Sequence, residues 1–344
     1  MRFQQYTNIG IIPTPYWLYI GIIPIYVDMK TKHFAIILAT IIVVSMGYTW
    51  LTPNSKQETI TVSGAFALYP LMVKWSEDYM EVHPEVKFEI SAGGAGKGMT
   101  DALNQLVDLG MVSREIYSEE ITQGAVWVAV AKDAVVIDIN SENPYLEYIM
   151  ERGITEDDLE KIVVTEEITT WGELLGREEI TDPINVYTRS DACGAAATIA
   201  QYIGYNQEDL LGIGVFGDPG LAEAVKNDVY GLGYNNVNYA YDLESGQAVE
   251  GLTVLPLDLN GDHVIDESED FYGTRQQIIL AITDGSYPSP PTRELNLVTL
   301  NGFSGASLEF LEWVLTEGQS SAMDAGYVPV SGEKAAAELS KIGK

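Results

Sequence analysis

The stretch TITVSGAFALYPLMVKW, residues 59–75, decides the fold. Its first residues are β-branched and typical of a strand, small residues follow, and from Leu68 onward apolar residues recur every three or four positions, as in a helix. The same alternation continues along the chain. Further strands are expected over 86–90 and 184–188, and further helices over 99–107, 194–203 and 307–316. Strands alternating with helices predict an α/β architecture.

Three junctions in this pattern join a strand to a helix through small residues: 63–67, 91–97 and 189–195. Each exposes the first N–H groups of a helix, which have no acceptor inside the helix and attract anions. One such junction is often a plain turn, but three of them, one beside Arg189, favour an anion site. The second junction is not a nucleotide-binding loop, because Gly98 follows Lys97 where Ser or Thr is needed.

A fourth segment, residues 108–115, places Ser113 and Arg114 after apolar residues. The end of a strand there would supply a hydroxyl and a guanidinium to the same site. The alternative for Arg114 is an ion pair with Glu115 or another acid.

Together these segments resemble the substrate-binding proteins of phosphate ABC transporters. The resemblance runs from about residue 59 to the C-terminus and depends on the order and spacing of several motifs. These motifs are SGAFALYPLMVKW, SAGGAGKGM followed by VDLGMVSRE, YTRSDACGAA, TWGELLG, GLGYNNVNYAY and GYVPV.

The resemblance implies a two-lobed, type II periplasmic-binding-protein-like fold with two hinge strands. The first lobe would comprise residues 57–131 and 292–344, and the second residues 132–291, with crossovers near 127–134 and 291–298. Such a protein is expected to act as a monomer. It captures phosphate in the cleft between the lobes and delivers it to an ABC permease without catalysing a reaction.

The resemblance also assigns site residues. Arg189 matches the arginine that pairs with phosphate, Asp191 the acid that steadies it, and Gly194 a backbone donor. The resemblance and the strand-to-helix junctions together predict a set of phosphate-binding residues. These are Ala65, Phe66, Ala67, Ser91, Ser113, Arg114, Arg189, Asp191, Cys193, Gly194 and Ala195.

The sequence departs from the family in having few hydroxyl groups at these positions. Cys193 and Ala195 stand where Ser and Thr are usual, and Ala65 and Phe66 stand where hydroxyl residues are common. Arg114 occupies about the place where one branch has an Asp that accepts the proton of hydrogen phosphate. The ligand could therefore be another tetrahedral oxyanion, namely sulfate, molybdate or tungstate. An acceptor for the proton would have to be a backbone carbonyl or Asp191, and weaker rejection of sulfate is expected than in the relatives that have this Asp.

A phosphatase-like enzyme is disfavoured by the same residues. The three His, at positions 33, 83 and 263, offer no base beside Cys193, and no two-metal carboxylate cluster is evident. A thiol or N–H contact is the favoured role for Cys193, and no catalytic cofactor is expected.

Residues 258–269, DLNGDHVIDESE, match the spacing of an EF-hand calcium loop. The predicted ligands are Asp258, Asn260, Asp262, the carbonyl of Val264, Asp266 and Glu269. His263 departs from the pattern, because position 6 is usually a Gly with positive φ. The alternative for this loop is a solvated acidic turn. If the calcium loop is the main feature of the chain, the alternative function is that of a calcium-stabilised surface protein with no transport role.

The N-terminal part contains Lys30 and Lys32 followed by an uncharged apolar run, residues 34–51. This order is typical of a secretory signal or a membrane anchor, and a buried core helix is the weaker alternative. Residues 1–52 are expected to form this segment and residues 53–58 a tether. Residues 1–28 could precede the true start at Met29, or could hold a second apolar segment.

The charge of the chain limits its partners. The sequence has 19 Lys and Arg against 50 Asp and Glu, a formal charge of −31. No basic stripe is left for nucleic acid, so a nucleic-acid partner is excluded. The acidic part is expected outside the cytoplasm, secreted or anchored to the outer face of the membrane by residues 34–51, because basic flanks stay on the cytoplasmic side.

Overall fold

The computed structural model describes residues 57–343. The chain divides into two units, Met1–Ser55 and Lys56–Lys344, and the second unit contains every described residue. The predicted signal or anchor segment and most of the tether lie outside the described residues. Within the described residues, none of the helices combines the length and the apolar character needed to span a bilayer.

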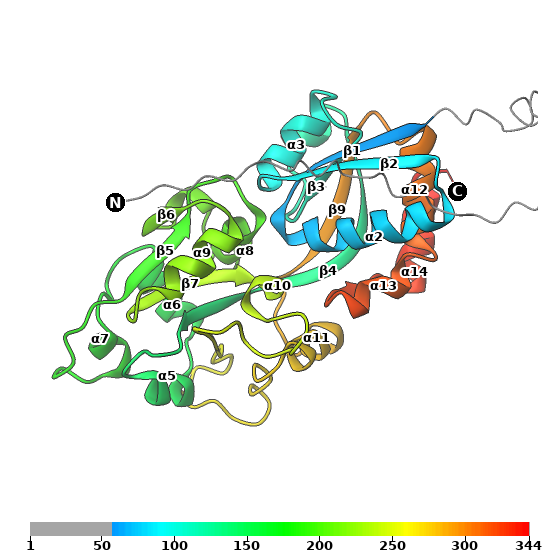
Figure 1. The fold of residues 1–344 in the computed structure, drawn as a ribbon. Helices are drawn as coiled ribbons and strands as arrows, with labels where there is room; N and C mark the ends of the chain where they lie inside the picture. Colours follow the sequence, from blue (N-terminus) through cyan, green and yellow to red (C-terminus); the bar gives the residue numbers. More distant parts are fainter. Residues whose placement is uncertain (1–56, 344) are drawn as a thin grey trace, which may run out of the picture. The chain divides into compact units, whose positions relative to one another are not determined.

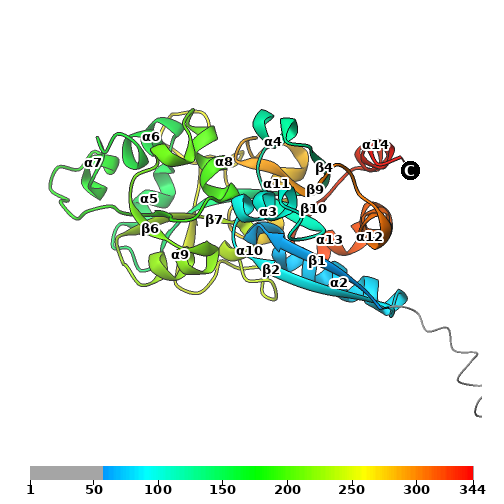
Figure 2. The same cartoon turned by 90° about the horizontal axis from the view of Figure 1, so that it is seen from above.

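The first hydrophobic core lies around a parallel set of strands. Its strands are β1 (Glu58–Gly64), β2 (Val86–Ala92), β3 (Leu109–Val112) and the antiparallel β9 (Thr292–Leu300). The helices that pack around it are η1 (Phe66–Leu68), α2 (Tyr69–Val82), α3 (Ala95–Leu103), α12 (Gly305–Leu315), α13 (Gln319–Asp324) and α14 (Gly332–Lys341) (Figure 2). The short α4 (Ser118–Thr122) follows β3 but buries no side chain. The apolar face of α2 buries Trp75 and Tyr79, and Tyr79 packs edge-on against Phe310 at 5.1 Å between ring centroids.

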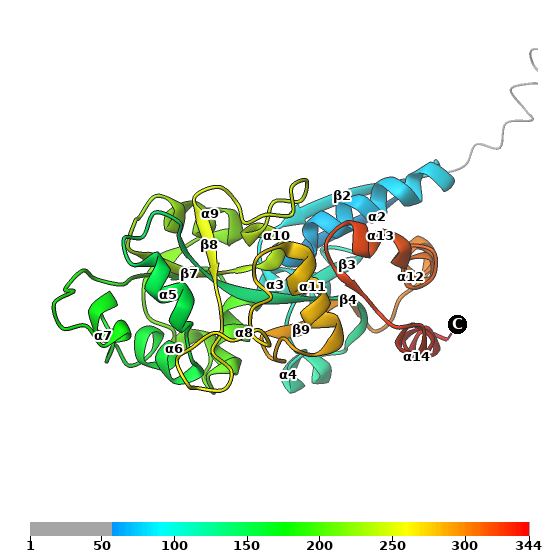
Figure 3. The same cartoon turned by 90° about the horizontal axis from the view of Figure 1, so that it is seen from below.

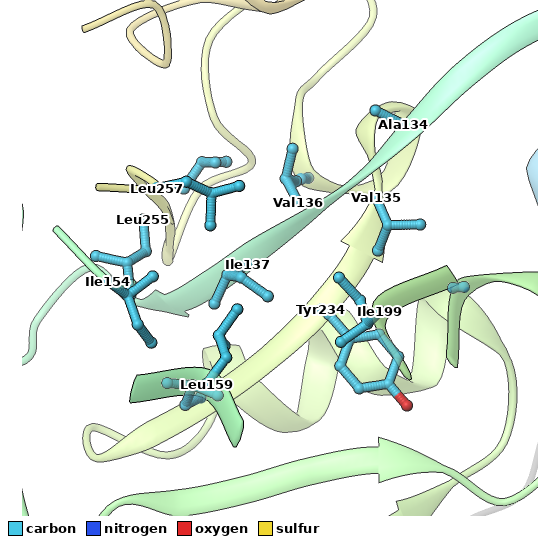
Figure 4. Close-up of a cluster of buried hydrophobic side chains, with 14 of the residues drawn as sticks. Ala134, Val135, Val136, Ile137, Ile154, Leu159, Ile199, Tyr234, Leu255 and Leu257 are labelled. Carbon is cyan, nitrogen blue, oxygen red and sulfur yellow. The ribbon is translucent and has the colours of Figure 1, made fainter. Parts of the chain in front are cut away.

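The second core lies around four further strands. These are β5 (Asn185–Arg189), β6 (Ile213–Val215), β7 (Gly231–Asn236) and β8 (Leu252–Leu255). The helices are α5 (Leu146–Arg152), α6 (Glu156–Val163), α7 (Trp171–Leu175), α8 (Gly194–Tyr202), η2 (Gln207–Asp209), α9 (Gly217–Lys226), α10 (Val237–Ala240) and α11 (Arg275–Asp284). Figure 4 shows how Ile137, Leu159 and Leu255 meet in this core.

One long strand, β4 (Ala125–Asn140), connects the two cores (Figure 1). It pairs with β9 and the short β10 (Val328–Pro329) in its first part, and with β7 and β8 in its second part. The resulting strand order is β2-β1-β3-β9-β4-β7-β5-β6. Asp133 of β4 lies opposite Arg293 of β9, and both are buried where the strands pass between the cores.

The expected strands and helices are confirmed, with one error. The helix predicted over 99–107 ends at Leu103, because Gln105 adopts a left-handed φ of 55°. Leu106 is 68% exposed and does not continue the apolar face. Asp108 then accepts a hydrogen bond from Thr61 N–H at 2.8 Å, which directs the chain into β3.

Asp138 of β4 is a buried carboxyl group in the second core. Its Oδ2 accepts a hydrogen bond from Asn235 Nδ2 at 2.8 Å, whereas Asp138 Oδ1 and Asn235 Oδ1 have no partner among the described residues. Burial raises the pKa of Asp138 to about 7, and the bond from Asn235 opposes the shift.

We expect Asp138→Asn to remove a pH dependence of stability. Because the folded pKa is raised, the contribution of Asp138 is fully present below the unfolded value of 3.8 and is lost as pH rises through about 7. At pH 8 the variant should be more stable, by up to about 4 kcal/mol, because Asn pairs with Asn235 without a buried charge. Urea unfolding between pH 4.5 and 8 measures the slope, with exposed Asp324→Asn as control. An unchanged slope in Asp138→Asn would contradict the assignment.

Candidate functional site

Arg189 ends β5 and lies at the centre of the candidate site. Its side chain is 1% exposed. Its Nε and Nη2 donate to the two carboxylate oxygens of Asp191 at 2.9 and 2.6 Å, and its Nη1 donates to Asp218 at 2.6 Å. Burial acts to lower the pKa of Arg189, but Asp218 and Asp191 outweigh it and hold that pKa well above its ordinary value. The guanidinium is therefore a fixed, charged fork with further N–H groups for an anion.

The start of α8 supplies backbone donors beside this arginine. Cys193 caps the helix, since its Sγ accepts from Ala196 N–H at 3.3 Å, and its own N–H donates to Gln207 at 3.1 Å. The amides of Gly194 and Ala195 come next, and the first amides of a helix have no intrahelical acceptor. Burial raises the pKa of the Cys193 thiol to about 12, so the thiol stays protonated and acts as a cap.

The loop after β1, which belongs to the first core, lies beside Arg189. The guanidinium carbon of Arg189 lies 5.5 Å from the centre of the Phe66 ring, within the range of a cation–π contact. Phe66 also packs edge-on against Phe216 at 5.9 Å and accepts a hydrogen bond from Tyr239 through its carbonyl. Of its neighbours, Ala65 donates its N–H to Met111 and Ala67 accepts a hydrogen bond from Tyr327.

Contacts between the cores close around this loop. The N–H of Gly96, at the start of α3, donates to the carbonyl of Ala192 at 3.0 Å. A Cβ on Gly96 would lie 2.7 Å from the Ala192 Cβ, and a Cβ on Gly94 would lie 2.7 Å from Asp191 Oδ2. Ser113 is buried directly after β3, and a Cβ on Gly194 would meet both the carbonyl and the hydroxyl of Ser113.

Two of the predicted phosphate-binding residues, Ser91 and Arg114, are not among the groups described above around Arg189. Ser91 is exposed on β2, at the edge of the sheet. The guanidinium of Arg114 pairs with both carboxylate oxygens of Glu120 at 2.7 and 3.0 Å and lies 4.0 Å from the centre of the Tyr117 ring. The structure therefore shows the ion pair that the sequence left open as the alternative for Arg114. This arginine lines a cavity of about 540 Å³ together with Arg293.

Sequence reasoning predicted Asp191 but missed Asp218, the second carboxylate that holds Arg189. Asp218 also accepts from the side-chain amide of Asn236, and Asn236 in turn accepts from Arg293. Arg293 donates to both oxygens of Asp133 at 2.9 and 3.2 Å. This buried polar chain connects the candidate site to the crossing strands β4 and β9. The only signal in the sequence was that Asn236 falls inside the motif GLGYNNVNYAY.

The predicted calcium ligands, Asp258, Asn260, Asp262, Val264, Asp266 and Glu269, lie together in the loop between β8 and α11. Over residues 57–343, no three acidic, His or Cys side chains already converge as a preformed metal site. The carboxylates of the loop accept backbone N–H groups instead.

Comparisons with known proteins point to one family. The family model for the PBP superfamily domain matches residues 52–317. The phosphate-binding protein PstS of Bacillus subtilis is 25% identical, covering 80% of this chain and 82% of that protein. The protein of the same name from Methanocaldococcus jannaschii is 26% identical, covering 85% and 90%.

Solved structures share the fold. A crystal structure from Clostridium perfringens with bound phosphate, assigned as a phosphate ABC transporter substrate-binding protein, superposes with a TM-score of 0.64 at 22% identity, covering 80% of this chain and all of that one. An ABC-type phosphate transport receptor from Vibrio cholerae gives a TM-score of 0.57 at 18% identity, covering 79% and 100%. The expected two-lobed fold is thereby confirmed.

Proposed function

Since the chain belongs to the PBP superfamily, we propose that it captures phosphate between its two lobes and delivers it to an ABC permease. The observation that carries the proposal is the buried guanidinium of Arg189, fixed between two carboxylates and adjacent to the α8 amides and the loop after β1. Arg offers two parallel N–H groups to one oxyanion, and the amides add neutral donors. Relatives named as phosphate-binding proteins over most of their length support the choice of ligand.

We assign residues 57–131 and 292–344 to the first lobe and residues 132–291 to the second. The two hydrophobic cores support this division, because they are made almost entirely from these two sets of residues. We further propose that the acidic part of the chain works outside the cytoplasm as a monomer, secreted or anchored by residues 34–51. The charge and the apolar run in the sequence support that location.

The proton of hydrogen phosphate needs a buried acceptor, which a sulfate site lacks. We assign this role to Asp191. Among residues 57–343 its Oδ2 accepts one hydrogen bond, from Arg189, and it lies at the junction of the lobes beside Gly94. With this acceptor the site should prefer phosphate to sulfate, molybdate and tungstate, although fewer hydroxyl donors surround the ligand than in most of the family.

Calorimetric titration of the purified chain with these four anions tests the function. Phosphate should bind at micromolar or lower Kd, on the order of −8 kcal/mol, and more tightly than the other three. If sulfate or molybdate binds more tightly than phosphate, that anion and not phosphate is the ligand of the protein. Absence of heat with all four anions would contradict an oxyanion-binding function.

We expect Gly96→Ala to weaken phosphate binding by tenfold or more. The new methyl group would lie 2.7 Å from the Ala192 Cβ and 3.1 Å from its carbonyl, so the lobes could not approach as closely. Ala is favoured over Gly in a helix, so the variant should remain folded. Calorimetry gives the affinity, and Gly93→Ala is the control because the new methyl there meets only the flexible Lys97 side chain. Equal affinities in the two variants would show that this approach is not needed for binding.

A further inference from the structure

The loop of residues 258–269 is held at both ends in the second lobe (Figure 3). At its start, Asp258 N–H donates to the carbonyl of Ile154 at 3.0 Å. After its end, Tyr272 is buried and accepts the N–H of Leu257 on its hydroxyl at 3.1 Å. In the middle, Ile265 donates its N–H to the carbonyl of Glu151 at 2.9 Å. These contacts fix the path of the loop at its start, in its middle and after its end.

Inside the loop, the backbone follows the turn that its spacing requires. Asp258 accepts N–H groups from Gly261 and His263 at 2.7 and 2.8 Å. His263 has a φ of 63°, the left-handed conformation for which position 6 usually carries Gly. The departure that the sequence showed at this position is thus accommodated by the backbone.

Glu269 supplies an independent observation. The residue is 3% exposed, and its Oε1 accepts N–H groups from Leu259 and Asn260 at 2.7 and 3.1 Å, so the carboxylate faces the first turn of the loop. Its Oε2 is buried with no hydrogen-bond partner among the described residues. A buried carboxylate oxygen without a donor or a cation is strongly unfavourable.

The charges around Glu269 increase this cost. Asp258 has a side chain that is 0% exposed, and Asp262 and Asp266 follow in the same loop. In the part of the chain that is described, no Lys or Arg forms an ion pair with these four carboxylates, and the nearest ring nitrogen is His263 Nδ1, 3.5 Å from Asp258 Oδ2. A cation is the group that would satisfy Glu269 Oε2 and neutralise the cluster.

We propose that residues 258–269 bind one Ca²⁺ ion. Glu269 would supply both carboxylate oxygens, Asp258 a buried one, and Val264 its carbonyl. Asn260, Asp262 and Asp266 are exposed side chains that can turn toward the ion. An all-oxygen set with a bidentate Glu suits calcium, whereas magnesium demands a smaller octahedral shell and retains water.

The ion would connect two parts of the second lobe. Ile265 packs its side chain against Gly153, and the loop pairs with residues 151–154 through backbone hydrogen bonds. Calcium would therefore stabilise the fold, by mass action on the folded state. None of the contacts of Arg189 involves residues 258–269, so phosphate affinity should not depend on the ion.

The test compares two substitutions that remove the same charge from the same loop. Glu269→Gln changes the position 12 ligand, and Glu267→Gln changes an exposed position that is not a ligand. Each purified full-length protein is freed of metal with chelator, titrated with CaCl₂ by calorimetry, and unfolded thermally in calcium and in chelator. The parent and Glu267→Gln should bind one Ca²⁺ and melt several degrees higher in millimolar calcium, and Glu269→Gln should lose at least tenfold in affinity.

Other outcomes would overturn the proposal. No calcium heat and no shift in the parent would make the loop an acidic turn without an ion. Equal calcium binding in Glu269→Gln would place the ion elsewhere on the acidic surface. Asp262→Asn, at an exposed position 5, gives the same comparison if Glu269→Gln does not fold. MgCl₂ that binds as tightly as CaCl₂ would contradict the assignment to calcium.

Discussion

Replacing Arg189 by Lys is expected to weaken phosphate binding by about two to three orders of magnitude while the chain stays folded. Lys keeps one positive charge between Asp191 and Asp218 but loses the planar fork that holds both carboxylates and an oxyanion together. Hydrogen bonds to a buried charge are each worth about 1.5–3 kcal/mol, which sets the size of the loss.

The design separates binding from folding. Arg189→Met would leave two buried carboxylates without a cation and destabilise the fold by about 3–5 kcal/mol, so the Lys variant is the informative one. Calorimetry gives the affinity and urea unfolding the stability. Arg177→Lys is the control, since Arg177 stacks on Tyr148 at 3.7 Å on a different part of the second lobe. A phosphate affinity unchanged in Arg189→Lys would remove Arg189 from the site.

The substitution Arg293→Met is expected to lower the stability of the fold by an amount comparable to the loss of binding free energy in Arg189→Lys. The substitution leaves Asp133, which is 1% exposed, without the guanidinium that pairs with both its oxygens. Burial raises the pKa of Asp133 and Arg293 opposes that rise, so removing Arg293 should raise the pKa further. The free energy of unfolding should fall by about 3–5 kcal/mol near neutral pH, and by less in acid, where Asp133 is protonated.

A double-mutant cycle checks that the cost comes from the unpaired charge. Asp133→Leu with Arg293→Met removes both charges, and the double variant should be more stable than Arg293→Met alone. Urea unfolding of the parent, both single variants and the double variant gives the coupling free energy. Additive effects of the two substitutions would show that Asp133 and Arg293 do not stabilise each other.

The sequence predicted what depends on local pattern. Arg189 and the amides of Gly194 and Ala195 could be found because a strand end, small residues and a helix start follow one another within a few positions. The ion pair between Arg114 and Glu120 could not be predicted from the sequence. It depends on how the Glu120 side chain is oriented, because Glu120 also accepts the N–H of Tyr117.

The polar chain beyond Arg189 was unpredictable for a different reason. Asp218, Asn236 and Arg293 are brought together by strand pairing and by crossing of the chain between lobes, over sequence separations of 18 and 57 residues. In a very acidic sequence, nothing distinguishes an Asp or Asn that will be buried from the many that are exposed. Their partners become evident only when the tertiary structure encloses them.

The cap on α8 has a practical consequence for chemical labelling. Cys193 is the only cysteine in the chain, it is 4% exposed, and its thiol is held protonated. Maleimides and similar reagents attack the exposed thiolate, so the native cysteine should remain unmodified at neutral pH. A single cysteine introduced at an exposed position, such as Thr100 on α3, can then carry a fluorophore or spin label without removal of the native one. A pair of such labels, one on each lobe, would report the distance between the lobes in solution.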